Sequence, residues 1–459
     1  MALKVLIVGA GIAGPALALL LQRSNTSHDV TVIERAPGLR KNGLQIDLRA
    51  QGLPVIRKLG LERAIRECTV PEDGFAMVGS QGRPWGVLGK NDSGKGQQSM
   101  TSEWEIMRGD LVQVLYDASL KEAEKTRASG EGGGVRYEFN KAIVGLEQDP
   151  VRDSGVNVTF SDGTTGRYDL VVGADGQWSK TRRLLFGEEA SAAMFKSLDL
   201  YAAYYTVPRE ADDDATARWF AAPERRCIVT RSAAGSIPGT SSPSDPRTQV
   251  YLSKLQAPSH PTAGATASSK TPPPPRSELA RCLRRPVEEQ KRVYARAFAD
   301  AGWQAGRFVR EMERAEDFYA QEIGQVKCAR PSEGRVALLG DAGYCPAPVT
   351  GMGTTVSLVG AYVLAGELAR HSEGDGACDV VAALESYNRV VRPYVDEAQK
   401  LAPGAPWILF PETAFGVLLM NIIFGILSWS NIFNLILRLM PEDKGGLAIP
   451  EYPELNLEP

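Results

Sequence analysis

The chain has 459 residues, 43% of them hydrophobic and 23% charged, which is the composition of a globular protein long enough for two or three domains. A net charge of −3 gives no electrostatic basis for a nucleic-acid partner. Six cysteines without a CxxC pair argue against a structural zinc site and a disulfide framework, so we expect a reducing, cytoplasmic environment. The three histidines are expected at the surface, which argues against a histidine-based catalytic or metal site.

The N-terminal segment predicts a dinucleotide-binding unit. In "LKVLIVGAGIAGPALALLLQ" a buried-strand pattern leads into Gly9-x-Gly11-x-x-Gly14 and an Ala/Leu-rich helix. Gly9 permits a tight turn, Gly11 lets the backbone approach a pyrophosphate, and Gly14 lets the helix pack on the strand. The next strand, "DVTVIE", ends at Glu34, at the spacing of an acid that accepts the ribose hydroxyls of an adenosine. Because the pattern starts at residue 3, we expect no signal peptide before it.

Two later segments repeat the pattern of a strand that ends on glycine and aspartate. "RYDLVVGADGQWSKTRRLLFG" carries Asp175 at its strand end, followed by Ser179 as a candidate helix cap. "GRVALLGDAGYCPAPVTGMGTT" carries Asp341 at its strand end, before a second Ala/Leu-rich helix. In the loop between them, two prolines restrict the backbone and two spaced glycines allow it conformations that other residues disfavour. A cap role for Asp341 is the alternative to a ligand role.

Between these units the sequence favours a second domain built from an antiparallel sheet. Residues 75–89 read as a hairpin, and "SLDLYAAYYTVP", "RWFAAPERRCIVTRSAAG" and "TQVYLSKLQ" read as strands. Tyr204 and Tyr205 point to opposite faces of their strand, so Tyr204 is a candidate for a hydrogen bond in a pocket, against the alternative of a packed sheet aromatic. Residues of about 236–276 are rich in Pro, Ser, Thr, Ala and Gly, and we expect a disordered insertion there.

The three motifs resemble, in their order, those of the class A flavoprotein monooxygenases, the group of p-hydroxybenzoate hydroxylase. The motifs are GxGxxG followed by Glu-Arg, then GADGxxSxxR, then GDAxxxxxPxxGxG. The third motif most resembles the branch of tetracycline-inactivating and fungal secondary-metabolite monooxygenases. The resemblance extends from residue 3 to about 400. With this resemblance we expect an α/β fold with a discontinuous Rossmann-like FAD-binding domain (1–75, 101–187 and 325–400). From the sequence itself we expect the remaining segments to form an antiparallel β-sheet substrate domain (76–100 and 188–324) and an apolar helical C-terminal segment (401–459).

The resemblance also implies which residues hold the cofactor. Asp341 would accept a hydrogen bond from a ribityl hydroxyl, and Arg108, at the start of a predicted helix, would reach the pyrophosphate and ribityl region. Thr354 and Thr355 would cap the helix that points at the pyrimidine end of the flavin. Arg35 would contact a phosphate of NADPH, unless it is a solvated surface arginine. The predicted cofactor-binding residues are Gly9, Gly11, Gly14, Glu34, Arg35, Gly43, Arg108, Asp175, Asp341, Gly351, Gly353 and Thr354.

Two departures from the family pattern stand in the third motif. Many members have Ala-His where this chain has Gly343-Tyr344, and an Asn where it has Thr355. The change from His to Tyr removes a group that titrates near neutrality, but it leaves the loop and the aspartate in place.

The implied chemistry belongs to the cofactor. FAD would take a hydride from NADPH, form a C4a-hydroperoxide with O₂ and pass one oxygen to an aromatic, polyketide, terpenoid or alkaloid substrate, with no protein nucleophile. The main alternative is a dehydrogenase or reductase of the same fold that does not activate oxygen. An NAD-dependent dehydrogenase and a non-catalytic flavin sensor are further alternatives.

The C-terminal segment carries no charge between Glu412 and Arg438. As one helix it is long enough to cross a hydrocarbon layer. Its Asn and Ser residues, with "SWSN" as a turn, favour instead two shorter helices that pack on the protein, pair between subunits or lie on a membrane surface. Membrane association through 405–440 and the oligomeric state are left open.

Overall fold

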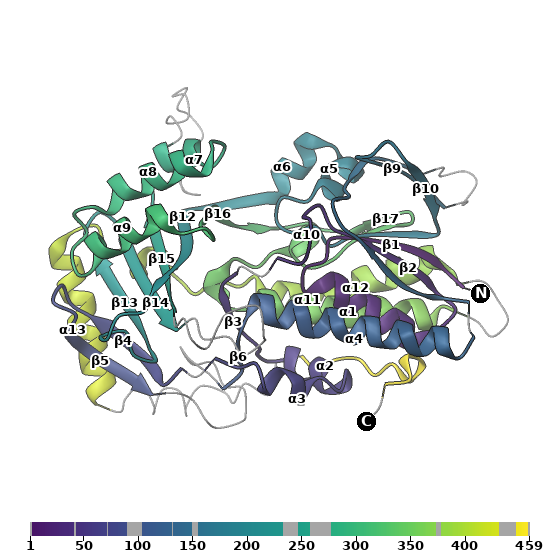
Figure 1. The fold of residues 1–459 in the computed structure, drawn as a ribbon, viewed down its shortest axis with the longest axis horizontal. Helices are drawn as coiled ribbons and strands as arrows, with labels where there is room; N and C mark the ends of the chain where they lie inside the picture. The colour runs from purple at the N-terminus through teal and green to yellow at the C-terminus, as the bar shows by residue number, and fades with distance from the viewer. Residues whose placement is uncertain are drawn as a thin grey trace.

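The computed structural model describes residues 2–40, 43–70, 72–89, 103–130, 132–148, 155–232, 247–257, 277–372, 378–430 and 447–457. Within these ranges two large sheets stand at opposite ends of an elongated molecule, joined by the long strands β12 and β16 (Figure 1). The glycine motifs lie on one sheet and the aromatic strands on the other. The surface between them is therefore where a cofactor and a substrate can meet.

The first sheet has the strand order β17-β18-β11-β1-β2-β7 and is parallel except for the β17–β18 pair. The strands β1, β2, β11 and β18 are largely apolar runs buried on both faces, as is typical of parallel sheets, whereas the edge strands β7 and β17 are more polar and more exposed. Their bounds are Lys4–Val8 (β1), Asp29–Ile33 (β2), Gly134–Glu138 (β7), Leu170–Gly173 (β11), Ser332–Glu333 (β17) and Val336–Leu338 (β18).

Helices cover one face of this sheet and a small antiparallel sheet covers the other (Figure 1). The helical layer consists of α1 (Ala13–Ser24), α4 (Arg108–Ala128), α11 (Gly353–Arg370) and α12 (Val380–Ala398), with the short α2 (Gly52–Lys58) and α3 (Glu62–Arg66) beside it. The opposite layer consists of β8 (Ile143–Gln148), β9 (Val156–Phe160) and β10 (Thr165–Tyr168). After β11 the chain continues through α5 (Lys180–Phe186) and α6 (Glu188–Met194) into β12 of the second sheet.

The second sheet has the order β16-β12-β15-β14-β13-β4-β5, and all its pairs are antiparallel except β13–β4. Its bounds are Gly74–Val78 (β4), Pro84–Gly89 (β5), Phe195–Pro208 (β12), Thr216–Ala222 (β13), Arg226–Ser232 (β14), Arg247–Leu255 (β15) and Tyr319–Val326 (β16). One face packs on α7 (Glu278–Cys282), α8 (Val287–Phe298) and α9 (Ala305–Arg314). The other face turns toward the first sheet and its loops.

The predicted disordered insertion at about 236–276 is wrong for part of its length. Residues Arg247–Leu255 form β15, which lies between β12 and β14 in the middle of the sheet. This confirms the strand predicted at "TQVYLSKLQ", where a segment with β-branched and aromatic residues outweighs the composition that surrounds it. Residues 233–246 and 258–276 lie outside the described residues.

The C-terminal segment is not one apolar helical unit. Helix α13 (Ala414–Trp429) packs on the edge strand β5, where Ser428 Oγ accepts from Val87 N (3.0 Å) and donates to Val87 O (2.7 Å). The other side of α13 exposes large apolar side chains: Phe415, Leu418, Leu419, Ile422, Ile423, Ile426 and Trp429. Residues 447–457 return to the first sheet's helices, where Tyr452 Oη donates to Glu367 (2.6 Å).

Within the described ranges no helix has both the length and the apolar character needed to cross a membrane. Residues 431–446, the rest of the uncharged stretch, lie outside them. The structure therefore gives no support to the spanning interpretation of the tail.

The expectation of surface histidines is wrong for His28. Its ring is buried and Nδ1 accepts a hydrogen bond from Leu3 N (3.0 Å). Burial lowers the pKa of His28 to about 4, because the charged ring would lose its hydration, and the nearby N-terminal charge adds to the effect.

Candidate active site

The carboxyl ends of three neighbouring strands meet at one edge of the first sheet. Ala174 N donates to Val8 O (2.8 Å), and Leu339 N donates to Gly173 O (2.8 Å). A Cβ on Gly9, whose φ is +114°, would lie 2.5 Å from Ala174 O, and a Cβ on Gly340 would lie 3.4 Å from Ala13 Cβ. The three glycine-containing motifs, remote in sequence, therefore lie together at one edge of the sheet, the edge at which ligands bind in such sheets. We call the region around this edge the groove.

The glycine turn leaves the N-terminus of α1 available to an anion. The helix begins after Ile12 without a side-chain cap and without an acid in its first turn. A Cβ on Gly14 would lie 2.1 Å from Gly9 O, so that glycine is required by packing. A Cβ on Gly11 would meet nothing nearer than the Arg108 guanidinium at 3.5 Å, so that position is open to a ligand. Free N–H groups, the helix dipole and a guanidinium together suit a pyrophosphate.

Glu34 stands beside this turn. Its carboxylate accepts from Ala10 N (3.1 Å) and Ala36 N (3.0 Å), and Arg40 lies 3.8 Å away. Arg35 is exposed. Arg40, which the sequence interpretation passed over, has its pKa lowered by burial and by the charges of Arg35 and Arg108, while Glu34 opposes the shift. A carboxylate among basic side chains suits the ribose and phosphates of a nucleotide.

Arg108 is held over the turn by the two-stranded ribbon of β3 (Gln45–Asp47) and β6 (Glu105–Met107). Arg108 N donates to Leu44 O (3.0 Å), and a Cβ on Gly43 would lie 3.0 Å from Arg108 Cβ. Gly43 is thus needed for the arginine stem to pass, which places Gly43, Arg108 and Gly11 side by side.

Asp341 is the first residue of the short helix α10 (Asp341–Tyr344), whose cap position is Gly340 and has no side-chain cap. The carboxylate is therefore not used as a helix cap. Burial raises the pKa of Asp341, and the charge of Arg108 partly opposes this. The neighbouring Tyr344 pairs its hydroxyl with that of Tyr387 (2.8 Å) inside the core.

The loop after Asp341 differs in one respect from the prediction. Helix α11 starts at Gly353 after Met352 and has no side-chain cap, so the prediction that Thr354 and Thr355 cap it is wrong. The helix starts before the threonines, which puts both inside its first turn, and Thr355 Oγ1 donates instead to Arg49 O (2.9 Å). No atom approaches the Cβ position of Gly353 within 4 Å. The open space beside the uncapped helix start suits a ligand that carries negative charge.

The remaining loop glycine, Gly351, has a φ of +65°, and a Cβ there would lie 3.2 Å from Arg49 Nη1. A side chain at this position would strain the backbone and crowd Arg49.

Asp175 differs from Asp341 because its carboxylate is already hydrogen-bonded to the first turn of the helix that follows it, α5. Its carboxylate accepts from Lys180 N (2.7 Å), Thr181 N (3.0 Å) and Thr181 Oγ1 (3.1 Å). Ser179 caps α5 by accepting from Arg182 N (2.9 Å), as predicted. The buried Arg182 donates to Ala342 O (2.7 Å), so this unit fixes the Asp341 segment. The predicted cofactor contact of Asp175 stays a prediction.

The second sheet turns an aromatic face toward this groove. Tyr204, Tyr251 and Tyr319 pack there in a cluster that also contains Leu44 and Ala347 of the two flavin-side loops. Tyr205 points to the opposite face, where Oη donates to Phe308 O (3.0 Å). A narrow hollow lies between Gly43 and Gln249, Tyr251 and Tyr319 of the sheet. Burial raises the pKa of Tyr204 to about 12, and the role of this residue toward substrate stays a prediction.

A buried charged cluster, which the sequence interpretation also missed, joins this face to the ribbon. Arg231 donates to Glu72 (2.6 Å) and Glu105 (2.8 Å), and Gln45 Nε2 donates to both carboxylates. The two glutamate side chains are at most 1% exposed. Burial raises the pKa of Glu105 to about 8; the charge of Arg231 opposes this shift and Glu72 adds to it. No short motif marks these residues, because they come from three separate elements.

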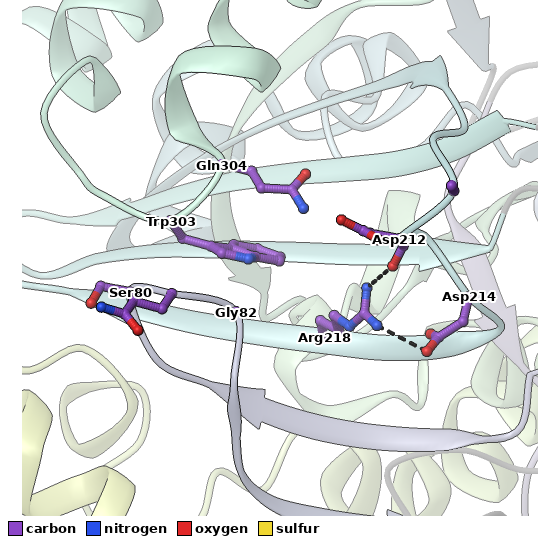
Figure 2. A pocket seen from close by; sticks show the side chains of 9 residues that line it. Ser80, Gly82, Asp212, Asp214, Arg218, Trp303 and Gln304 are labelled. Carbon is purple, nitrogen blue, oxygen red and sulfur yellow. Dashed lines mark hydrogen bonds and ion pairs between the residues drawn. The ribbon is translucent and has the colours of Figure 1, made fainter.

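A hollow of about 540 Å³ lies away from the groove, lined by Ser80, Gln81, Gly82, Ala211, Asp212, Asp214, Arg218, Trp303 and Gln304 (Figure 2). Its arginine is already used, since Arg218 donates to Asp212 O (2.6 Å) and to Asp214 (2.9 Å). None of the predicted site residues lines it, so we place the chemistry at the strand ends.

The groove fits FAD. A turn that requires glycine at positions 9 and 14, an uncapped helix start, an acid beside the turn and the half-buried carboxylate of Asp341 near Arg108 suit its pyrophosphate, ribose and ribityl chain. The fold and site therefore define a flavoprotein with a second sheet facing the flavin.

Comparison with known proteins places the chain further. Residues 2–402 match the family described as FAD binding domain. The chain is 40% identical over 465 residues to the FAD-dependent monooxygenase asL6 of Sarocladium schorii, with both chains covered completely. Tetracycline destructase Tet(51) has a similar structure, with a TM-score of 0.69 and 27% identity over 98% of this chain and 99% of that one. Klebsiella pneumoniae HpxO complexed with FAD and uric acid shares the fold, with a TM-score of 0.64 and 18% identity over 97% of each chain. The chain belongs to this FAD-binding family, as one of the class A FAD-dependent monooxygenases.

Proposed function

We propose that this monooxygenase uses NADPH and O₂ to transfer one oxygen atom to a small aromatic, polyketide, terpenoid or alkaloid substrate. The observation that carries the proposal is the convergence of the glycine turn and the Asp341 loop on one groove, directly across from the aromatic face of the second sheet. In the same proposal, residues 1–75, 101–187 and 325–400 form the FAD-binding domain, and 76–100 and 188–324 form the substrate domain.

FAD, when bound, would supply hydride acceptance and oxygen activation. The protein would hold it by residues at three places along its length. The N-terminus of α1 and Arg108 would bind the pyrophosphate, Glu34 the adenosine ribose, and Asp341 a ribityl hydroxyl. The uncapped start of α11 would stabilise negative charge on the reduced ring. Arg35, which is exposed beside Glu34, would contact a phosphate of NADPH.

The aromatic face would orient the substrate and keep water away from the reacting atoms. Because orientation and water exclusion need packing more than reactive side chains, an apolar face is sufficient for this step. Tyr204 is the proposed hydrogen-bonding residue on it.

The test begins with protein reconstituted with FAD. We expect NADPH to reduce the flavin, and we expect rapid mixing of the reduced enzyme with O₂ to give a transient absorbance before oxidised flavin returns. Reduction without such a transient, with substrate bound, would support a dehydrogenase or reductase instead. The Arg35→Ser variant should raise the KM for NADPH and leave the KM for NADH unchanged; equal effects on both would remove Arg35 from the proposal.

A further inference from the structure

A row of paired residues crosses the flavin-facing side of the second sheet. The register pairs Trp219 with Val229, Val229 with Tyr251, Tyr251 with Tyr204, and Tyr204 with Tyr319. Directly paired residues share a face, so these side chains line one surface. The Tyr204 ring lies 5.2 Å from that of Tyr251 and 5.0 Å from that of Tyr319. This row, Trp219–Val229–Tyr251–Tyr204–Tyr319, forms an aromatic floor.

Most hydrogen-bond donors on this floor are already used by the protein. Tyr251 Oη donates to Gln249 Oε1, and Gln249 Nε2 points to Met107 Sδ. Tyr204 shares a hydrogen bond with Gln321. The indole nitrogen of Trp219 is different: Nε1 is buried and has no hydrogen-bond partner among the residues that the structure describes. A buried indole N–H normally finds a partner, because leaving it unpaired is costly.

The Trp219 ring is held in place by aromatic neighbours, 6.4 Å from Phe75 and 6.2 Å from Phe410. Phe410 belongs to the same apolar cluster as Ala347 of the Asp341 loop and the tyrosines of the floor. The Trp219 ring therefore lies in the apolar cluster that the floor shares with Ala347, and this is where we place the substrate.

The charged residues beside the floor bear on the charge of the substrate that the site accepts. Arg231 is paired in register with Gln249, two residues from Tyr251. Its guanidinium donates to both carboxylate oxygens of Glu72 and to both of Glu105. It is therefore not available to a carboxylate or phenolate on a substrate. Because the pKa of Glu105 is raised to about 8, Glu105 is protonated at neutral pH, and the charges of Glu72 and Arg231 balance each other. The cluster therefore offers no positive charge to an additional anion, which would have to lose its hydration without compensation.

From these observations we infer that the site accepts uncharged ring compounds that carry a hydrogen-bond acceptor, that Trp219 Nε1–H donates to that acceptor, and that the Glu72–Arg231–Glu105 cluster disfavours anionic substrates. The inference rests on the proposed function, because it places the substrate between the floor and the flavin. Trp219 is thereby a specificity-determining residue, and it takes no part in proton or electron transfer.

The experiment uses FAD-loaded protein and two matched pairs of probes, methyl salicylate with salicylate and methyl gallate with gallate. Binding is followed by the change in the flavin absorbance spectrum. We expect the esters to bind at least about tenfold more tightly than the acids. The Trp219→Phe variant should weaken ester binding about five- to tenfold, the loss of one hydrogen bond, with FAD affinity unchanged. Trp429→Phe, a change at an exposed indole on α13, serves as the matched control and should change neither.

Three results would overturn the inference: acids that bind as tightly as the esters, no ester binding by the FAD-loaded protein, or ester binding that Trp219→Phe leaves intact. A second variant tests the charge argument separately. Glu72→Gln should leave Arg231 with one carboxylate and strengthen salicylate binding relative to methyl salicylate, and an unchanged ratio would count against the cluster. Each of these failures leaves FAD binding and NADPH oxidation intact, whereas failure of the proposed function itself would appear as loss of one of those two.

Discussion

Two aspartates at equivalent strand ends, Asp175 and Asp341, have different environments. The carboxylate of Asp175 is satisfied by the first turn of α5, where backbone N–H groups and Thr181 donate to it. Asp341 stands beside Arg108 without a helix-capping bond, and burial raises its pKa. Asp341 is half-buried and hydrogen-bonds with Cys345, and its ionised form can gain further from a ligand that donates a hydrogen bond. This difference makes Asp341 the better ligand of the two.

Asp341→Asn should therefore separate stability from binding. The amide removes the cost of ionising a buried carboxyl, so the apoprotein should melt at a higher temperature at neutral pH. FAD should bind about tenfold or more weakly, because a charge-assisted hydrogen bond to the ribityl chain becomes a neutral one. Thermal unfolding and a fluorescence titration with FAD measure the two effects.

The matched control is Asp379→Asn, which changes an exposed aspartate that caps α12 through Ala382 N (3.0 Å). It should lower the melting temperature slightly and leave FAD affinity as it is. An unchanged FAD affinity in Asp341→Asn would remove that residue from the site.

At the scale of elements, the turn between β1 and α1 shows that the glycines of one motif have separate physical reasons. Gly9 and Gly14 are required by contacts within the protein, since a Cβ on either would overlap backbone oxygen. Gly11 has space around it and no backbone conformation that demands glycine. Its reason must come from outside the chain, and the uncapped helix start beside it indicates a phosphate group.

A pair of alanine substitutions tests this division. Gly14→Ala should lower the melting temperature markedly, because a methyl group 2.1 Å from Gly9 O forces α1 away from β1. Gly11→Ala should leave the melting temperature of the apoprotein within a degree or two and weaken FAD at least about tenfold, because the methyl group occupies the approach of the pyrophosphate. Equal loss of stability in both variants would contradict the assignment of Gly11 to the cofactor.

For the whole molecule, the groove exists only because two sheets are held together. The Glu72–Arg231–Glu105 cluster joins β14 of the second sheet to the ribbon that carries Arg108. Two described parts of the C-terminal segment contact the two halves of the molecule: Ser428 of α13 bonds to Val87 of β5, and Tyr452 bonds to Glu367 of α11.

This arrangement predicts how stability depends on pH. The pKa of Glu105 is raised to about 8 in the folded protein, above that of an unfolded glutamate, so the folded state binds the proton more tightly. Stability should therefore fall as pH rises through about 5 to 8. Glu105→Gln, which imitates the protonated acid, should reduce this decline in melting temperature.

The control for that series is Glu103→Gln, two residues away, where the side chain forms an outer ion pair with Arg66 (3.2 Å). It should keep the pH profile of the unmodified protein. If the melting temperature of Glu105→Gln falls with pH as steeply as that of Glu103→Gln, then Glu105 does not take up a proton on folding.

The sequence alone determined what depends on local spacing. Turns, helix caps and strand ends are set by atoms close in the chain, so a few neighbouring residues are enough to predict them. This holds for the glycine turn with its strand and helix, for Glu34 at the next strand end and for the Ser179 cap. The tertiary structure decided what depends on packing across the chain. It put the strand predicted at "TQVYLSKLQ" between β12 and β14 in the middle of a sheet and bonded Thr355 to Arg49. It also aligned Trp219 with three tyrosines from separate strands and enclosed Arg231 between two glutamates. Contacts between strands far apart in sequence depend on register and burial, and no single segment contains that information.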